Sequence, residues 1–295
     1  MAKVDISATC PYEPKRVDVL DTHMAYLEAG TGDPIVFLHG NPTRAFLWRN
    51  VIPHVETLGR CLAPDLVGMG DSGPMSSGTY RYAEHIDYLD AWFDAVDVGE
   101  NAILVVHDWG AALGFNRIAE HAQDFAGLAY MEAMVRPRKW ADLPQDRAAQ
   151  FKAFRTAEGA APVLEGNLFV EKLLFEQGVI RALTQEEKAV YRAPYPDPES
   201  RRLTLVFSQE IPFDGEPADN HAIVQRYADH LAASDMPKLF INTTEGHALL
   251  GGPRDFCRTW KNQTEITVTG RHYAQEDSPH EIGEALAAFV SGIRN

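Results

Sequence analysis

One segment of the sequence places a carboxylate where an apolar strand passes into a helix. Residues 102–106 favour a strand, His107 and Asp108 follow it, and small residues after Trp109 begin a helical pattern. A sharp turn here would project the side chain of Asp108 at the N-terminus of that helix. Because Asp is also a favoured N-cap residue, Asp108 alone could equally be a helix cap.

Asp108 could act as a nucleophile without a base, because a carboxylate is already ionised at neutral pH. It could displace a leaving group from saturated carbon and form an alkyl ester. The strand, turn and helix around it resemble the nucleophile turn of the α/β-hydrolase fold, whose usual residue at this position is Ser. Hydrolysis of the ester would then require a base.

His272 is the candidate base. It lies in a loop between the last expected strand and the C-terminal helix, where the α/β-hydrolase fold carries its histidine. It would take a proton from the water that attacks the ester carbonyl. A single loop histidine is commonly only a surface residue, but the chain order nucleophile, acid, histidine favours the catalytic interpretation.

The histidine needs a carboxylate that fixes its tautomer and stabilises the imidazolium. Glu132 is the preferred candidate, because it stands where the apolar strand at 128–131 ends. Glu245 is the alternative, since it follows the later expected strand at 239–241.

Two residues are candidate halide ligands. Trp109 offers an indole N–H directly after the nucleophile, and Asn41 offers an amide NH₂ before Pro42. Each also has a plainer interpretation, Trp109 as a packing aromatic and Asn41 as a turn residue. Their occurrence together with Asp108 favours halide binding.

The elements that must position these residues alternate along the chain. Expected strands cover residues 35–38, 61–63, 102–106, 128–131, 239–241 and 266–268, and expected helices cover residues 82–96, 111–121, 146–154, 167–177, 185–191 and 279–293. This alternation predicts a wound, mostly parallel α/β sheet. Between 135 and 218 it lapses into helical segments followed by a Pro-rich stretch from 194 to 217. We therefore expect a core of residues 1–134 and 219–295, with a helical cap of residues 135–218.

The amino-acid composition disfavours several classes of protein. The 295 residues carry a formal charge of −15, which disfavours binding to nucleic acids or anionic membranes. The three cysteines, Cys10, Cys61 and Cys257, form no C-x-x-C motif, so neither disulfides nor a metal site are expected. The segment Met1–Ser7 lacks the apolar run of a signal peptide, and no stretch approaches the roughly 20 apolar residues of a membrane span. We expect a soluble cytoplasmic protein.

At its candidate site residues the sequence resembles the haloalkane dehalogenases, and the resemblance covers nearly the whole chain. The matching stretches are residues 39–43, 47–50, 64–73, 105–110, 130–133, 211–217, 237–242 and 272–277. The position of Glu132 resembles the subgroup that uses Glu as catalytic acid. The resemblance implies an eight-stranded α/β-hydrolase sheet with an inserted cap and a reaction without cofactor or metal. The implied partners are a halogenated alkane and the halide ion, and the other products are a primary alcohol and a proton.

Three positions depart from the family pattern. Phe207-Ser208 stands where a Trp-Pro pair is expected, Ala274 is small where a larger aliphatic residue is usual, and the link from Gly73 to Tyr80 is short. The first two predict an atypical cap lining and pocket volume.

Several other functions remain open. An epoxide hydrolase would share the Asp nucleophile and use cap tyrosines, for which Tyr191 and Tyr195 are candidates. A coelenterazine-type luciferase shares the Asp, Glu and His arrangement. A haloacetate dehalogenase would carry Arg at position 109, and a non-catalytic binding module would be expected to lose part of the triad. Haloalkane dehalogenation is the preferred function.

Overall fold

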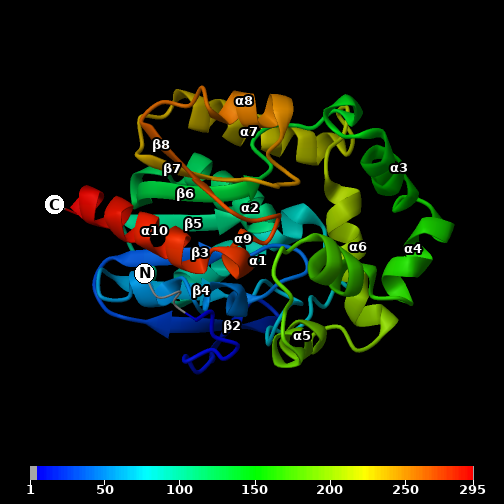
Figure 1. Cartoon of the computed structure of the whole chain (residues 1–295), viewed down its shortest axis with the longest axis horizontal. Helices are drawn as coiled ribbons and strands as arrows, with labels where there is room; N and C mark the ends of the chain where they lie inside the picture. Colours follow the sequence, from blue (N-terminus) through cyan, green and yellow to red (C-terminus); the bar gives the residue numbers. More distant parts are fainter. Residues whose placement is uncertain (1–4, 295) are drawn as a thin grey trace.

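An eight-stranded sheet organises the chain (Figure 1). The computed structural model describes residues 5–294. The strands are β1 (Lys15–Val19), β2 (Thr22–Ala29), β3 (Pro34–Leu38), β4 (Arg60–Pro64), β5 (Ala102–His107), β6 (Phe125–Ala133), β7 (Lys238–Thr243) and β8 (Gln263–Val268). Their spatial order is β1-β2-β4-β3-β5-β6-β7-β8, and β2 runs antiparallel to both of its neighbours while the other pairs are parallel. This confirms the predicted eight-stranded, mostly parallel sheet.

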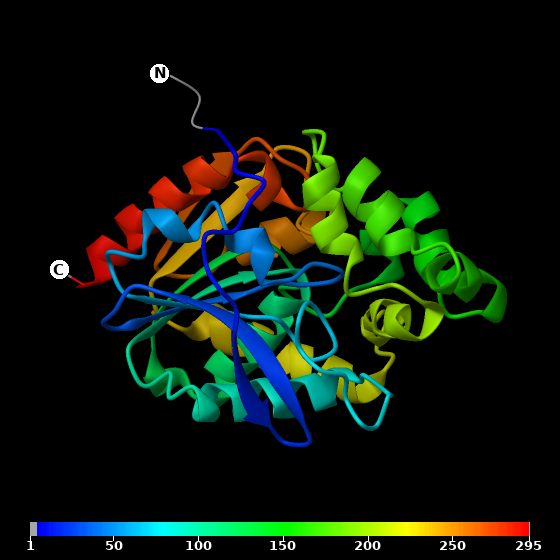
Figure 2. The same ribbon diagram turned by 90° about the horizontal axis from the view of Figure 1, so that it is seen from below.

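Helices cover both faces of the sheet (Figure 2). One face carries α1 (Tyr82–Ala95), α2 (Asp108–Glu120) and α7 (Ala218–Ala233), and the other carries η1 (Ala45–Trp48), η2 (Ile52–His54) and α10 (Pro279–Arg294). The remaining short helices of the core are η3 (Ala122–Asp124), α8 (Gly251–Cys257) and α9 (Ala274–Asp277). Because the central strands β3 and β5 are covered on both sides, all their residues are buried, which explains their unbroken apolar sequence.

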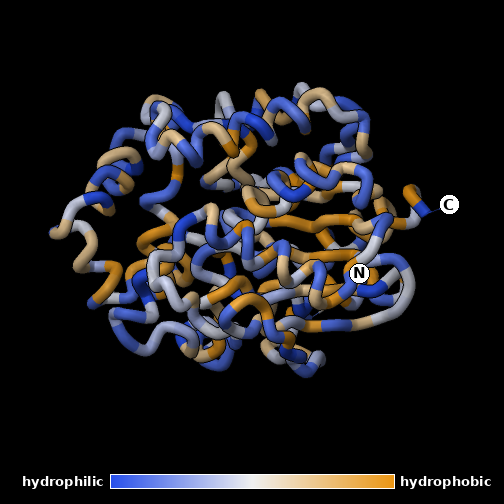
Figure 3. Tube along the Cα trace, turned by 180° about the vertical axis from the view of Figure 1, so that it is seen from behind, coloured by the Kyte–Doolittle hydropathy of each residue, from blue (hydrophilic) through white to orange (hydrophobic). Residues whose placement is uncertain are grey.

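Apolar residues concentrate on the sheet and become sparse toward the outer helices (Figure 3). Successive side chains of β3 enter two different cores, as the pleat of a strand requires. Ile35 belongs to the cluster that packs under α10, whereas Val36 belongs to the cluster under α1 and α2. The two cores fix the sheet in the middle of the molecule and hold its carboxyl ends in place.

A helical segment between β6 and β7 lies beyond one end of the sheet (Figure 1). It contains η4 (Trp140–Asp142), α3 (Gln145–Ala153), α4 (Ala157–Leu164), the π-helical η5 (Phe169–Gln177), α5 (Gln185–Arg192) and α6 (Pro198–Glu210). The helices predicted at 146–154, 167–177 and 185–191 correspond to α3, η5 and α5. The sequence patterns did not predict α4 or α7.

The stretch described from the sequence only as Pro-rich contains the 13-residue helix α6. Pro198 occupies its first position, where the missing backbone N–H costs no helical hydrogen bond. Asp197 caps the helix by accepting a hydrogen bond from the Ser200 N–H at 2.9 Å. These prolines therefore frame a helix and do not interrupt it.

The division into a core of residues 1–134 and 219–295 and a cap of residues 135–218 stays a prediction. Its second boundary coincides with the start of α7, which packs on α2 through the rings of Tyr227 and Phe115 at 5.5 Å. Residues 1–4 and 295 lie outside the described residues, and so does the first part of the segment predicted to lack a signal peptide. Within residues 5–294, no helix combines the length and apolar character needed to cross a membrane.

A buried network of charges joins the helical segment to the core. Arg49 follows η1, and its guanidinium lies 2.7 Å from Glu276 of α9 and 2.5 Å from Glu187 of α5. All three side chains are fully buried. Arg181 contacts both carboxylates from the helical segment, and the hydroxyl of Tyr191 donates to Glu276. Each buried charge is thus paired, as burial requires.

Replacing Arg49 by Met should lower the free energy of unfolding by about 3–5 kcal/mol, because it leaves buried carboxylates without their main partner. The matched control is Arg258→Met, which breaks the partly exposed ion pair with Glu265 and should cost about 0–1 kcal/mol. Urea denaturation measures both losses. Equal losses for the two variants would contradict the proposed importance of the buried network.

Candidate active site

Asp108 stands at a strained turn between β5 and α2. Its φ of +52° lies in the left-handed region, which few residues other than glycine adopt. The helix α2 begins at Asp108 itself and His107 is its N-cap, so Asp108 is not a helix cap, contrary to the alternative interpretation. Gly40 gives the carboxylate room, because a Cβ there would lie 2.3 Å from Asp108 Oδ1.

The carboxylate of Asp108 is held by different partners at its two oxygens. Oδ1 accepts a hydrogen bond from the Asn41 backbone N–H at 2.8 Å, and Oδ2 lies 3.4 Å from His272 Nε2. Burial acts to raise the pKa of Asp108, but the hydrogen bond and charge of His272, assisted by the Trp109 backbone N–H, hold it below its ordinary value. Asp108 is therefore ionised although only 23% of its side chain is exposed.

His272 bridges the two buried carboxylates. Its Nδ1 lies 3.0 Å from Glu132 Oε2, while its Nε2 faces Asp108. Burial acts to lower the pKa of His272, but the two carboxylates outweigh it and raise the pKa to about 9. In the resting protein His272 is therefore an imidazolium at neutral pH.

Glu132 also has a left-handed backbone, with φ +44°, at the end of β6. Its Oε2 accepts hydrogen bonds from the backbone N–H groups of His247 at 2.6 Å and Ala248 at 2.8 Å. Burial alone would raise the pKa of Glu132, yet the His272 cation and these N–H groups lower it. Glu245, the alternative acid, is instead exposed and pairs with Arg271 at 3.2 Å.

The two candidate halide ligands lie beside Asp108 and line the same cavity. Among residues 5–294, the indole N–H of Trp109 has no hydrogen-bond partner. The Asn41 Nδ2 donates to the Thr204 carbonyl at 2.9 Å, and an amide NH₂ carries a second hydrogen that this bond leaves free. Phe207 packs against the Trp109 ring at a centroid distance of 4.9 Å and thereby fixes its orientation.

Sequence reasoning did not identify two buried histidines that hold this site together. His107 Nε2 hydrogen-bonds the backbone carbonyl of His272 at 2.8 Å, and His39 Nε2 accepts from the Leu66 N–H at 2.9 Å. Burial lowers the pKa of both, to about 3 and about 4, so they are neutral. Their positions in the sequence, directly before Asp108 and Gly40, could have indicated that these two histidines lie close to the active site.

The cavity in front of Asp108 has a volume of about 310 Å³. Most of its lining is apolar, and Leu143, Phe151, Phe169, Leu173, Ile211 and Phe213 contribute to it. Of the two atypical positions predicted to shape it, Ser208 lines the cavity, whereas Ala274 is buried in the core under α10 and does not line it. Tyr191 and Tyr195 do not line it either. Sequence reasoning also missed two cavity-lining arginines, Arg138 and Arg147.

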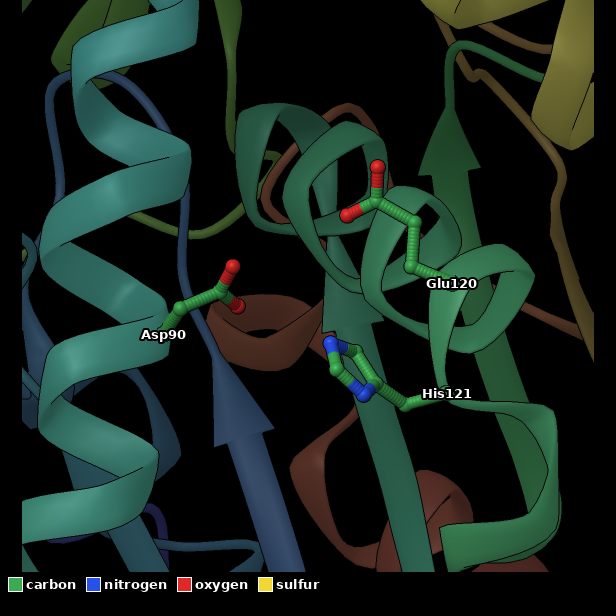
Figure 4. A group of neighbouring side chains, drawn as sticks. All are labelled: Asp90, Glu120 and His121. Carbon is green, nitrogen blue, oxygen red and sulfur yellow. The ribbon is translucent and has the colours of Figure 1, made fainter.

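One further cluster has metal-ligand residue types, and it lies at the C-terminal end of α2, whereas the cavity lies at the N-terminal end. Figure 4 shows Asp90 of α1 facing the end of α2, where Glu120 and His121 lie. Asp90 is ion-paired with Arg117, and Glu120 pairs with Arg226 at 2.7 Å. Because both carboxylates already have cationic partners, this cluster is not a free set of metal ligands.

Comparison with known proteins agrees with this geometry. Residues 33–279 match the family described as alpha/beta hydrolase fold. The haloalkane dehalogenase of Sphingobium indicum is 51% identical over 96% of both chains, and that of Mycolicibacterium smegmatis is 46% identical over 92% of this chain and 88% of its own. The crystal structure of the haloalkane dehalogenase DbeA from Bradyrhizobium elkani superposes with a TM-score of 0.91, 39% identity and coverage of 96% of this chain and 98% of that chain.

The sheet, the turn at Asp108 and the family match define an α/β-hydrolase. Within that class, the chain belongs to the haloalkane dehalogenases, which are hydrolases acting on carbon–halide bonds.

Replacing Asp108 by Asn should lower the pKa of His272 by about 1–3 units, because it removes one of two carboxylates that stabilise the imidazolium. NMR titration of the histidine ring nitrogens measures this pKa. Asp146→Asn is the control, since Asp146 lines the cavity but does not contact His272. An unchanged His272 pKa in Asp108→Asn would refute the assigned electrostatic coupling.

Proposed function

We propose that the chain cleaves carbon–halogen bonds of haloalkanes with Asp108 as nucleophile, His272 as base and Glu132 as the acid that orients the base. The observation that carries this proposal is an ionised, half-buried carboxylate that faces an apolar cavity beside an unpaired indole N–H. The free cysteines Cys10, Cys61 and Cys257 support a reducing location, the cytoplasm.

In the first step, Asp108 Oδ2 attacks the carbon that bears the halogen. The carbon–oxygen bond forms as the carbon–halogen bond breaks, and the halide leaves with both electrons. Trp109 and Asn41 would stabilise the halide through their N–H groups. Oδ2 suits this role because Oδ1 is already bound by the Asn41 backbone N–H at 2.8 Å.

In the second step, water attacks the carbonyl carbon of the ester on Asp108, and His272 Nε2 takes the proton of that water. Oδ1 becomes the oxyanion, and the Asn41 backbone N–H, which already donates to it at 2.8 Å, would stabilise the new charge without rearrangement. Collapse of this intermediate breaks the bond between the carbonyl carbon and the oxygen that bears the alkyl group. The departing alkoxide takes the proton of the newly added hydroxyl group, which releases the alcohol and restores the carboxylate. His272 keeps the proton taken from water, because the restored Asp108 carboxylate raises its pKa again to about 9. The proton that His272 lost to solvent after ester formation is the acid released by the reaction.

The charge on Asp108 would control when His272 can act as a base. While Asp108 is ionised, it helps to hold the pKa of His272 at about 9, so the imidazole is protonated and cannot accept a proton. Formation of a neutral ester removes this support, and the pKa of His272 falls. Ester hydrolysis should therefore slow as the pH drops below that lowered pKa, since His272 becomes protonated again.

Glu132 would be the catalytic acid, which assigns the chain to the subgroup with Glu at this position. The 3.0 Å contact with His272 Nδ1 supports this role, and the exposed ion pair of Glu245 argues against the alternative. The role is to fix the Nδ1–H tautomer and to stabilise the imidazolium that forms in the second step.

An epoxide hydrolase is less consistent with the cavity. Ring opening there would require a tyrosine hydroxyl that faces the substrate, whereas Tyr191 donates to Glu276 and Tyr195 lies outside the cavity lining. The hydroxyl of Tyr273, which does line the cavity, donates to the Asn41 carbonyl at 2.9 Å.

Incubation with 1-bromohexane should release bromide, acid and hexan-1-ol in equal amounts, and Asp108→Asn should abolish the release because an amide is a poor nucleophile. Ion chromatography follows bromide, and pH-stat titration follows acid. A terminal epoxide serves as the comparison substrate. Formation of a diol without any bromide release would overturn the proposal.

His272→Phe should trap the reaction halfway, because alkylation of Asp108 needs no base but hydrolysis of the ester does. Mass spectrometry should find a protein heavier by one hexyl group, with the modification in the peptide that contains Asp108. His121→Phe is the control, since His121 follows the C-terminal end of α2 and does not line the cavity. An adduct on another residue, or none, would contradict the two-step mechanism.

A further inference from the structure

A buried arginine without an ionic partner lines the substrate cavity. Arg138 follows β6, and only 9% of its surface is exposed. Its guanidinium donates one hydrogen bond, from Nη2 to the Ala248 carbonyl at 3.0 Å. Among residues 5–294, its other side-chain N–H groups have no hydrogen-bond partner and no carboxylate lies within ion-pair distance. A charge this deeply buried normally has a counterion.

The carboxylates around Arg138 are occupied by other cations. Glu132 and Asp108 share His272, and Asp142 forms an ion pair with Arg136 at 2.9 Å. Burial lowers the pKa of Arg138, and these distant charges offset that effect only in part. An arginine side chain stays protonated in proteins, so the guanidinium keeps its charge, and it lacks a dedicated counterion.

The backbone holds Arg138 firmly in this position. Its N–H donates to the Pro212 carbonyl at 3.3 Å, and its carbonyl accepts from the Asp214 N–H at 2.9 Å. This pairing joins the segment after β6 to the turn after α6. Together with the hydrogen bond from Nη2 to the Ala248 carbonyl, this pairing positions the guanidinium before any ligand arrives, which lowers the entropy cost of binding.

A second guanidinium, that of Arg147 in α3, lines the same cavity and is partly exposed. It has no ion pair among residues 5–294. Asp146 beside it is exposed and supplies one opposing charge at the lining. The rest of the lining is mostly apolar, as an alkyl chain requires.

We propose that the cavity accepts haloalkanes whose far end bears a carboxylate, with Arg138 as the residue that binds the carboxylate. This inference rests on the proposed function and specifies its substrate class. The carbon–halogen bond would lie at Asp108 and Trp109, the alkyl chain along the apolar lining, and the carboxylate at the free N–H groups of Arg138. Arginine suits this role because its planar fork matches a carboxylate.

The test compares 6-bromohexanoate with 1-bromohexane, which have the same number of carbons and differ at the end remote from bromine. The intact protein should release bromide from both. Arg138→Met should lower kcat/KM for 6-bromohexanoate by about 10- to 100-fold relative to 1-bromohexane, the range expected for losing a charge-assisted hydrogen bond. Arg138→Lys keeps the charge but loses the fork, so its ratio should lie between those of the other two proteins.

Lys139→Met is the matched control. It removes the same charge from the neighbouring residue, but Lys139 is exposed and does not line the cavity. Its ratio of kcat/KM for the two substrates should equal that of the unmodified protein. A measurement without any variant adds a check that does not depend on folding: hexanoate should inhibit bromide release from 1-bromohexane more strongly than hexanamide does.

The outcomes separate this inference from the proposed function. Bromide release from 1-bromohexane but not from 6-bromohexanoate would overturn the inference and leave the proposed function intact. Release from neither substrate would overturn the proposed function itself. Equal losses on both substrates in Arg138→Met would assign Arg138 to positioning the Ala248 loop and would overturn its role in substrate binding, as would equal inhibition by hexanoate and hexanamide.

Discussion

Two carboxylates and one imidazole share a largely enclosed site, and the imidazolium together with backbone N–H groups keeps both carboxylates ionised. The N–H groups of Asn41 and Trp109 support Asp108, and those of His247 and Ala248 support Glu132. Burial alone would favour protonated carboxylates, and a protonated Asp108 could not attack carbon. The hydrogen bonds and charge of His272 oppose this effect most strongly, and the backbone donors strengthen that opposition. The left-handed backbone at Asp108 and at Glu132 turns each side chain away from its strand toward these donors.

The rest of the fold can be understood as support for these two turns. Parallel strands β5 and β6 are neighbours, so their carboxyl ends bring Asp108 and Glu132 to the same edge of the sheet. The loop after β8 supplies His272 from a third position, and His107 fixes the backbone of that loop. Four separate segments of the sequence thereby meet within a few ångströms, because the sheet holds the ends of its strands in register.

Much of the sheet and of the candidate site could be predicted from the sequence, because short sequence patterns indicate them. The apolar runs of β3, β5 and β7 were recognisable since both faces of these strands are buried. The geometry also brings together Asp108, Glu132, His272, Asn41 and Trp109 as predicted, although their roles remain proposals. The edge strand β1 and its neighbour β2 were not identified individually, because most of their residues are exposed or only half-buried and no continuous apolar run marks them.

The sequence could not predict features that depend on contacts between distant segments. Arg138 reads as one of many surface arginines until the turn at Pro212 and the loop at Ala248 enclose it. The helix α6 was obscured by prolines whose effect depends on position and not on number. The left-handed backbone at Glu132 could not be predicted, because the residue there is neither glycine nor asparagine. The surrounding hydrogen bonds impose this conformation.

The buried network around Arg49 also constrains how this protein can diverge. Arg49 and Glu276 belong to the sheet-bearing part, whereas Arg181 and Glu187 belong to the helical segment. A recombinant that takes its helical segment from a relative must therefore bring matching charges at all four positions, or it buries an unbalanced charge. A substitution at only one of the four positions would also leave a buried charge unbalanced and lower the stability of the fold. The four residues can therefore change only together. The segment that shapes the substrate cavity is exchangeable only together with residues far from that cavity.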